Sequence, residues 1–454
     1  MGISLPLFPS LWPDPDALGT ITDLYELTML AGYLAEGMGG QSATFEVFVR
    51  RFPPNRSFLV FAGLEQAIGD LSRLAFSNEQ VEALRRWPAF QSQPATFFET
   101  LRRFRFEGDV FAVPEGTIVF PGETLVRVTA PLPQAQWVET FLLASLGYQT
   151  LVASKAARVV LAARGKSLFE FGARRAHGPQ AGLLAARAAY LAGFDSTSHV
   201  EAARLLNIPC VGTMAHSWVQ SFPTEAEAFE AYARVFPNTT TLLVDTYDTL
   251  EGVRKAASIA PPNSAVRIDS GDVGELAARS RAILDEAGRS DVKIMASGDL
   301  DEEALERLSA AGAPIDGYGI GTELVTSRDA PAISMVYKLV ELDGRGRYKL
   351  APGKKTYPMA KQVYRRRDAD GRFAGDLVTR ADEPAPEGFE PLLTPVMRGG
   401  EPIPHHLSLA EARIRCRAQL AALPDDLRSL HTQAGYPVDY SDRLEAEAAR
   451  LMRL

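Results

Sequence analysis

A histidine stands just beyond a short apolar run near the middle of the chain. The run Cys210–Val211 predicts a buried strand that stops at Gly212, and His216 follows in a predicted strand-to-helix loop. An imidazole in such a loop can move a proton or act as a nucleophile near neutral pH. Because a lone histidine is more often structural, a catalytic prediction for His216 depends on what surrounds it.

Other predicted strands between residues 167 and 340 end in the same way, with polar or glycine residues after an apolar run. In a parallel α/β fold the carboxyl ends of the strands meet at one edge, where active sites form. The side chains expected there are Glu170, Arg174, Arg175, His177, Asp195, Ser196, Ser198, Thr213, Asp245, Asp269, Ser270, Asp272, Ser297, Asp299 and Thr322.

Two of these strand ends are rich in glycine. The segments ASGD (296–299) and GIGT (319–322) follow consecutive predicted strands. Gly298, Gly319 and Gly321 would let backbone N–H groups approach an anion, and late loops of this kind are a common phosphate site in α/β barrels. The alternative is that both segments are tight structural turns.

Three further assignments have simple structural alternatives. Arg174 and Arg175 could hold a carboxylate or a phosphate through paired hydrogen bonds, or form a solvated basic turn. Asp272 and Asp299 could be helix caps. The segment Gly165–Ser167 resembles the end of a P-loop, but Val160 stands where that motif requires its first glycine.

The elements that would position these residues alternate along the chain. About seven short apolar strands alternate with amphipathic helices between residues 167 and 340, and 335–341 could be an eighth strand. This pattern predicts an irregular (β/α)8-type barrel over 141–345, rather than an open sheet. Residues 1–140 predict an N-terminal α/β domain, and 346–454 a C-terminal region that packs back on it.

Composition narrows the class of protein. The chain has 454 residues and a net charge of −8, which gives no sign of nucleic-acid or anionic-membrane binding. Only two cysteines occur, which excludes a disulfide scaffold and suits a reducing cytoplasm. The first 16 residues lack the basic start of a signal peptide, and no stretch is long and apolar enough to span a membrane.

The sequence resembles the nicotinate phosphoribosyltransferase family over most of its length. Each motif alone is weak, but together they are highly specific. They are TDLYELTM (Thr22–Met29), FEFGARRAHGP (Phe169–Pro179), GFDSTSHV (Gly193–Val200), GTMAHSWV (Gly212–Val219), RIDSGD (Arg267–Asp272), ASGDLDE (Ala296–Glu302), GIGTELVTS (Gly319–Ser327) and VYKLVE (Val336–Glu341).

The resemblance implies an ATP-assisted enzyme that makes nicotinate mononucleotide from nicotinate and phosphoribosyl pyrophosphate for NAD synthesis. It implies an irregular barrel with a smaller α/β domain built from both chain ends, working as a homodimer with shared active sites. His216 would be the histidine that ATP phosphorylates. Tyr25 would stack on the nicotinate ring in the neighbouring subunit's site.

Further roles are implied for the strand ends. Arg174 would lie near the nicotinate carboxylate, and Asp269 and Asp272 would act near the ribose and pyrophosphate, with Mg²⁺ as cofactor. Asp245 or Glu170 could orient His216. The remaining expected substrate contacts are Phe171, Arg175, Thr213, Ser297, Gly298, Asp299, Gly319, Gly321 and Thr322.

Two rival enzymes fit parts of this pattern. A nicotinamide phosphoribosyltransferase would share the fold and the phosphohistidine. An aldolase-like barrel acting on a sugar phosphate would need a Schiff-base lysine at a strand end. Lys293 begins its strand, at the wrong end, whereas Lys338 lies within the possible eighth strand and keeps that hypothesis open.

Overall fold

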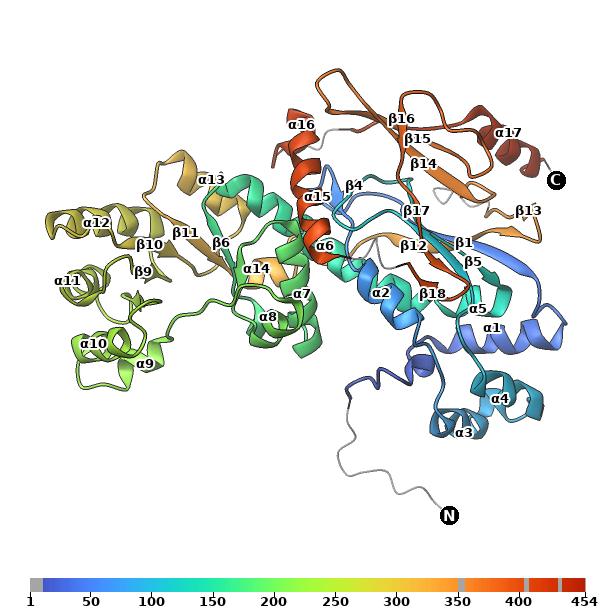
Figure 1. Ribbon diagram of the computed structural model, residues 1–454, viewed down its shortest axis with the longest axis horizontal. Coiled ribbons are helices and arrows are strands. Elements are labelled where there is room, and N and C mark those ends of the chain that lie inside the picture. Colours follow the sequence, from blue (N-terminus) through green and yellow to red (C-terminus); the bar gives the residue numbers. More distant parts are fainter. Residues whose placement is uncertain (1–10, 350–355, 404–407, 432–434, 454) are drawn as a thin grey trace, which may run out of the picture.

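The computed structural model describes residues 11–349, 356–403, 408–431 and 435–453 (Figure 1). The first ten residues, on which the expectation of no signal peptide partly rests, lie outside this set. Among the described residues, no helix combines the length and apolar character needed to cross a membrane. Figure 1 shows a parallel α/β part, coloured green to yellow, beside a part with antiparallel sheets, built from both ends of the chain.

A six-stranded parallel sheet is the framework of the first part. Its strand order is β7-β6-β11-β10-β9-β8, and Cys210 adds one isolated parallel bridge to Thr197 beside β7. Because all six strands run the same way, their carboxyl ends face one side. The strands are β6 (Ser167–Glu170), β7 (Ser196–Thr197), β8 (Thr241–Leu243), β9 (Ala265–Ile268), β10 (Lys293–Ala296) and β11 (Gly317–Ile320).

Helices follow these strands and begin at capping side chains. Asp248, Asp272 and Asp301 each accept a backbone N–H of the first helical turn, satisfying a donor that has no partner within the helix. The helices are α6 (Glu139–Ala163), η3 (Ala173–Arg175), α7 (Pro179–Ala192), α8 (Val200–Leu206), α9 (His216–Gln220), α10 (Glu225–Val235), α11 (Thr249–Ile259), α12 (Val273–Glu286), α13 (Glu302–Ala310) and α14 (Thr322–Val325).

An α/β fold with a parallel sheet is confirmed, but an eight-stranded barrel is not. The segment around Cys210 contributes a bridge and no longer strand. The expected eighth strand, β12 (Met335–Leu342), pairs antiparallel with β1 (Ser42–Val49) in the other part of the molecule. The alternating apolar residues of 335–341 are more typical of an antiparallel sheet than of a buried parallel one, but they do not indicate which strand is the partner.

The second part holds a seven-stranded sheet of order β13-β12-β1-β5-β3-β17-β18, a four-stranded sheet of order β16-β14-β15-β19 and the pair β2-β4. Residues from both chain ends therefore share one sheet. The remaining strands are β2 (Leu59–Val60), β3 (Asp109–Ala112), β4 (Ile118–Val119), β5 (Thr124–Pro131), β13 (Arg345–Gly346), β14 (Lys361–Arg367), β15 (Phe373–Arg380), β16 (Phe389–Pro391), β17 (Thr394–Arg398), β18 (Glu401–Pro402) and β19 (Val438–Tyr440).

Shorter helices surround these sheets. The short strand β2 precedes the helix α2, and β15 lies in the C-terminal region. The division into three domains stays a prediction. The helices are η1 (Leu18–Thr20), α1 (Leu24–Ala35), α2 (Leu64–Leu71), α3 (Asn78–Arg86), η2 (Pro88–Phe90), α4 (Ala95–Arg102), α5 (Leu132–Trp137), α15 (Leu409–Ala422), α16 (Asp425–Arg428) and α17 (Asp442–Leu451).

The helix α6 connects the two parts and is largely buried. Lys155 and Arg158 on this helix both pair with Glu302 at the start of α13, at 2.5 and 2.8 Å. Asp329 pairs with Lys155 at 3.0 Å and with Arg56 at 2.6 Å. Buried charges of opposite sign satisfy one another here, so removing one partner would leave an uncompensated charge. This network therefore holds the parallel sheet against the N-terminal segment.

A buried carboxylate on α1 gives the protein a pH-dependent stability. Burial raises the pKa of Glu26 to about 7, although a hydrogen bond from Gln136 opposes the shift. Since the folded pKa exceeds the unfolded value, stability falls as pH rises from about 4.5 to 7 and stays lower above that range. Glu26→Gln should therefore raise the free energy of unfolding at pH 8 by roughly 1–3 kcal/mol, with little gain at pH 4.

Thermal unfolding of both proteins from pH 4 to pH 8 measures this effect. The exposed Glu36→Gln, at the end of the same helix, is the matched control and should change stability little at any pH. A constant difference between the Glu26→Gln variant and the parent across the range would contradict the assignment.

Candidate active site

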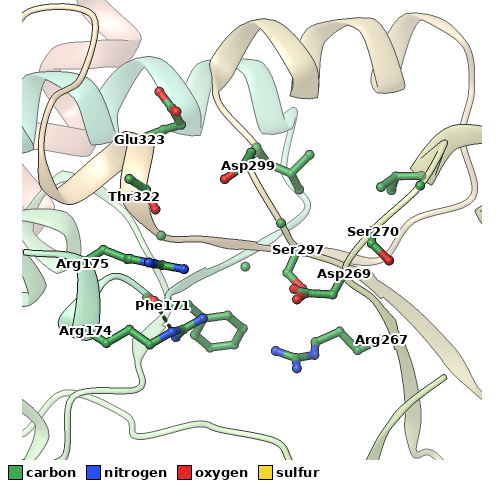
Figure 2. A pocket seen from close by; sticks show the side chains of 16 residues that line it. Phe171, Arg174, Arg175, Arg267, Asp269, Ser270, Ser297, Asp299, Thr322 and Glu323 are labelled. Carbon is green, nitrogen blue, oxygen red and sulfur yellow. Dashed lines mark hydrogen bonds between the residues drawn. The ribbon is translucent and has the colours of Figure 1, made fainter. Parts of the chain in front are cut away.

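A cavity of about 510 Å³ opens at the carboxyl ends of the parallel strands (Figure 2). Three arginines and three carboxylates face it, together with the glycine-rich ends of β10 and β11. The ends of β6, β9, β10 and β11 therefore meet at one edge, but the placing of Asp195 there was wrong, because Asp195 directly precedes β7 and lies at the opposite edge. The cavity lining includes Phe171, Arg174, Arg175, Arg267, Asp269, Ser270, Ser297, Gly298, Asp299, Gly319, Gly321, Thr322 and Glu323.

Arg267 and Asp269 bring opposite charges into the cavity from one face of β9 and its extension. They are two residues apart, and side chains two apart in a strand point to the same side. Burial lowers the pKa of the Arg267 guanidinium, while the carboxylates of Asp269 and Asp245 act in the opposite direction. Arg267 Nη2 donates to the Met214 carbonyl at 3.0 Å, and its buried Nε has no partner among the described residues.

Hydrogen bonds from two neighbouring strand ends fix the loop around Asp269. Ser297 donates its hydroxyl to Asp269 Oδ1. Asp245 Oδ2 accepts from the Asp269 backbone N–H at 3.0 Å and from the Ser270 hydroxyl at 2.6 Å. Asp245 therefore orders this loop. Its other oxygen is buried and lacks a partner within the described ranges.

His216 lies at the first position of α9, beside the cavity. Its side chain is 42% exposed, and its Nε2 is 3.9 Å from Asp269 Oδ2. Nδ1 is 3.2 Å from the Thr246 hydroxyl. Asp245 and Glu170 were the expected orienting residues, but these geometric contacts are made by Thr246 and Asp269. Glu170 instead accepts from Thr197 and from the Gly172 backbone, and burial raises the pKa of its carboxyl.

The glycine-rich loops are shaped by close backbone and ring contacts. Gly298 has a φ of +88°, and a side-chain carbon there would lie 2.2 Å from the Asp269 carbonyl oxygen. At Gly319 such an atom would lie 2.4 Å from the Phe171 ring. Both positions therefore need glycine for packing as well as for any approach to an anion. The structural and the functional interpretations of these loops are compatible.

Figure 2 shows Arg174 and Arg175 extending from one side of the cavity, with Asp269 and Ser297 on the other. Both arginines belong to η3, directly after β6. Arg174 Nη1 donates to the Phe171 carbonyl at 3.4 Å, a long contact that leaves most of its donors available. Both residues are exposed, as a solvated basic turn would be, and both also line the cavity, so the anion-binding role stays a prediction.

Four predicted site residues lie outside the cavity lining: His216, described above, and Thr213, Asp272 and Tyr25. Thr213 lines an adjoining cavity of about 350 Å³, of which Phe171 is also part. Asp272 caps α12 through the Glu275 N–H at 3.1 Å, as the simpler alternative proposed. Tyr25 is on α1, with 46% of its surface exposed, in the other part of the molecule from β9 and β10 (Figure 1). By contrast, Asp299 lines the cavity, and Asp301 is the residue that caps α13.

Two charged lining residues, Arg267 and Glu323, were not among the predicted site residues. The sequence contained a signal for Arg267. A charged side chain inside the apolar run 265–268 is expected only where it meets an opposite charge or a ligand. Glu323 follows the predicted Thr322 and pairs with Arg328 at 2.6 Å. No sequence signal separates it from an ordinary helix-start acid.

The charges in the cavity suit phosphate-bearing ligands. Arginine binds phosphate and carboxylate through a planar set of donors, and Arg174, Arg175 and Arg267 approach from two sides. Among the described residues no group of three or more His, Cys, Asp or Glu side chains forms a complete metal site. A magnesium ion shared with substrate phosphates needs only one or two carboxylates, and Asp269 and Asp299 fit that need.

Three family models match successive stretches of the chain: the nicotinate phosphoribosyltransferase (NAPRTase) N-terminal domain over residues 20–147, the NAPRTase family over 166–376, and the C-terminal domain over 386–446. A nicotinate phosphoribosyltransferase of Mycobacterium tuberculosis is 48% identical over 438 residues, covering 95% of this chain and 93% of that protein. The chain belongs to the nicotinate phosphoribosyltransferase family. The resemblance seen in the sequence motifs is thereby confirmed.

Solved structures of similar proteins agree with the fold. The crystal structure of human nicotinic acid phosphoribosyltransferase has a TM-score of 0.86 and 32% identity, covering 95% of this chain and 99% of that one. A nicotinate-nucleotide pyrophosphorylase from Pyrococcus furiosus has a TM-score of 0.74 and 25% identity, covering 92% and 99%. The family fold therefore extends over nearly all of the chain.

Both the family match and the positions of the two candidate lysines argue against the aldolase hypothesis. Lys338 lies on β12, within the antiparallel sheet, where its Nζ donates to the Tyr337 carbonyl at 2.6 Å. It is not part of the cavity lining. Lys293 begins β10, at the opposite end of the strand from the cavity. Neither lysine can reach a substrate held by the three arginines, so this alternative is wrong.

Proposed function

We propose that this chain catalyses the ATP-assisted transfer of phosphoribosyl from phosphoribosyl pyrophosphate to nicotinate. The products are nicotinate mononucleotide and pyrophosphate, for NAD synthesis. The observation that carries the proposal is the set of three arginines around one cavity. The chain belongs to the nicotinate phosphoribosyltransferase family, and its own net charge is −8. Both substrates are anions, and a local cluster of cations is what an acidic protein needs to bind them.

The cavity has distinct groups for each part of the substrates. Gly298, Gly319 and Thr322, in the loops after β10 and β11, suit the 5-phosphate. The face of Phe171 suits stacking on the pyridine ring, and Arg174 suits the nicotinate carboxylate. Arg267 and Arg175 are then left for the pyrophosphate.

The chemistry is a substitution at C1 of the ribose. The pyridine nitrogen forms a bond to C1 while the C1–O bond breaks, and the electron pair of that bond leaves with pyrophosphate. The ribose develops oxocarbenium character, so the protein must align both reactants and offset charge on the leaving group. Asp269 lies where it could stabilise the positive ribose, and Arg267 where it could stabilise pyrophosphate.

Magnesium is the proposed cofactor. The sequence predicted Asp269 and Asp272 as its ligands. Of these two, the Asp269 carboxylate faces the cavity, and Asp299 is a second acceptor nearby. When bound, Mg²⁺ would screen the charge of the substrate phosphates. Asp272 stays a weaker prediction, since its carboxylate is engaged in capping α12.

ATP coupling is proposed to pass through His216. Its Nε2 would attack the γ-phosphorus of ATP, forming an N–P bond while the bond to the β,γ-bridging oxygen breaks and ADP leaves with the electron pair. Water later hydrolyses the phosphohistidine to phosphate. A half-exposed imidazole whose Nδ1 contacts the Thr246 hydroxyl has a reachable Nε2, which supports this role. The proposed location of the protein is the cytoplasm. Cys210 is an exposed free cysteine, and a reducing compartment would keep its thiol reduced.

The function is tested by product analysis. The protein is incubated with phosphoribosyl pyrophosphate, Mg²⁺ and ATP, and with nicotinate or nicotinamide. Nicotinate mononucleotide, pyrophosphate, ADP and phosphate are expected, with nicotinamide a poor substrate because it lacks the carboxylate that Arg174 would bind. Faster turnover of nicotinamide would favour the rival phosphoribosyltransferase. Absence of nicotinate mononucleotide would contradict the proposal.

A homodimer with shared sites is the proposed assembly. Tyr25 is exposed on α1 and lies outside its own chain's cavity, which supports a role in the site of a second copy. Mixing Tyr25→Ala protein with His216→Ala protein, each of which should lack ATP-coupled turnover, should then restore part of that turnover. About a quarter of parental activity is the upper limit, because hybrid dimers form half of a random mixture and keep one intact site each.

Subunit exchange must be shown independently, for example with differently tagged chains. Mixing His216→Ala protein with a second cavity variant, Arg174→Ala, is the control. Arg174 and His216 are proposed to serve the same chain's site. Each site of a hybrid dimer would then lack one of the two side chains, so this mixture should recover no ATP-coupled turnover. Recovery in the control but not with Tyr25→Ala would contradict the shared site as proposed.

A further inference from the structure

A cavity of about 610 Å³ lies at the opposite ends of the parallel strands from the candidate active site. It is enclosed by the end of α6, the start of β6, the α7–β7 connection and the C-terminal helices α15 and α16. Figure 1 shows α15 running along the junction between the two parts of the molecule. The charged residues in its lining are Lys166, Asp195, Arg413, Arg417 and Arg428.

Four cations therefore face this cavity against one carboxylate. That carboxylate is already engaged: Asp195 Oδ2 accepts from the Leu168 backbone N–H at 2.9 Å, and Oδ1 is 3.6 Å from Arg413. Arg413 is held in place by the carbonyls of Tyr190 and Phe194, and lies over the Tyr190 ring. The two groups offset each other and leave an excess of positive charge.

The remaining cations have donors to spare. The side chains of Lys166 and Arg417 make no hydrogen bond or ion pair with the part of the chain that the structure describes. Arg428 donates to the Ala421 carbonyl and its Nη1 is 3.7 Å from Asp425 Oδ1, but its buried Nε lacks a partner within the same described ranges. Lys166 and Arg417 are exposed, so their donors are free to meet a ligand, and Arg428 Nε is a buried donor that a ligand oxygen would satisfy.

One side of the cavity is apolar. Val160, Leu161, Leu168 and Leu420 contribute to its lining, and its volume falls in the range of small-molecule sites. We infer that this cavity binds a phosphorylated metabolite of mononucleotide size, at a site separate from the catalytic one. The phosphate would contact Lys166, Arg417 and Arg428, and the uncharged body of the ligand would cover the leucines.

The two sites share the strand β6 but not a ligand. β6 begins at Ser167 in the lining of this cavity and ends at Glu170, one residue before Phe171 in the catalytic cavity. Four residues of strand span roughly 13 Å, so a mononucleotide in one cavity leaves the other open. Phosphate binding in this cavity does not need a P-loop, a motif that Gly165–Ser167 resembles only at its end. The Ser167 backbone N–H is already bonded to the Asp316 carbonyl, and the side chains supply the charge.

The test uses calorimetric titration of the full chain with AMP. The parent protein should bind AMP, and Lys166→Glu/Arg417→Glu should bind it at least about tenfold more weakly, since charge-assisted contacts are replaced by repulsion. The matched control is Arg234→Glu, an exposed arginine on α10 that lines neither cavity. It should bind as the parent does. Arg174→Glu, in the catalytic cavity, should also keep its AMP affinity.

Turnover without AMP should be unchanged in Lys166→Glu/Arg417→Glu, which also shows that the variant is folded. If it does not fold, Lys166→Gln/Arg417→Gln serves the same purpose. No AMP binding by the parent, parental affinity in the charge-reversed variant, or loss of binding in Arg174→Glu would each overturn the assignment. So would a change of oligomeric state in Lys166→Glu/Arg417→Glu by sedimentation, because the surface would then be a contact between copies.

Discussion

His216→Ala should abolish phosphoryl labelling of the protein by ATP. The parent, incubated with γ-labelled ATP, should carry an acid-labile, base-stable label, because the His216 side chain is 42% exposed and its Nδ1, not its Nε2, contacts the Thr246 hydroxyl. Slow transfer of phosphoribosyl to nicotinate should continue in the variant, since its arginines and loops are intact. That residual activity should no longer respond to ATP.

His431→Ala is the matched control for this experiment. His431 is exposed and pairs with Glu306, away from the residues that line the catalytic cavity. Its loss should leave both labelling and ATP stimulation as in the parent. Labelling that persists in folded His216→Ala protein would remove the histidine from the ATP-dependent step, and the rest of the site would have to be explained without it.

Arg267→Met should lower kcat/KM for phosphoribosyl pyrophosphate by about 10²–10³-fold, the usual effect of removing one preorganised electrostatic contact to a transition state. Arg267 is partly buried, faces the cavity beside Asp269 and has an unpaired Nε among the described residues. A positive charge in such a place acts strongly on a departing pyrophosphate, because little water screens it. Steady-state kinetics with varied phosphoribosyl pyrophosphate measure the loss.

Two further variants separate this role from a structural one. Arg267→Lys keeps the charge but loses the planar set of donors, so it should recover only part of the activity. Arg254→Met removes an exposed arginine of α11 and should leave the kinetics unchanged. If folded Arg267→Met protein stays within about threefold of the parent, Arg267 does not act on the transition state.

Much of the fold was predictable because strands and helices differ in the period of their apolar residues. An alternation of short strands and helices between residues 167 and 340 was predicted, and β6 and β8 to β11 lie there with helices between them. Pairing was not predictable, and β12 illustrates the reason. Its alternating residues favour an antiparallel sheet over the parallel one, but no local pattern indicates that β1 is the partner, which only the three-dimensional packing decides.

The site was predictable where a residue type has one common use. Arginines and glycines at strand ends indicated an anion site, and they do line the cavity. Aspartates were harder, since the same side chain can cap a helix or face a ligand. Asp272 and Asp299 had the same two alternatives, and the structure separates them into a cap and a cavity residue. The contact between His216 and Thr246 joins residues from different loops, which no local pattern reveals.

The pairing of β1 with β12 has a consequence for the nascent chain. β1 ends at Val49 and β12 begins at Met335, so 285 residues separate the two strands. At about 5–20 residues per second, the ribosome needs roughly 15–60 s to make that stretch. During this time one edge of β1 has no partner strand, and an unpaired apolar edge is prone to pair with other chains. Expression at a lower temperature or with chaperones is therefore expected to improve the soluble yield.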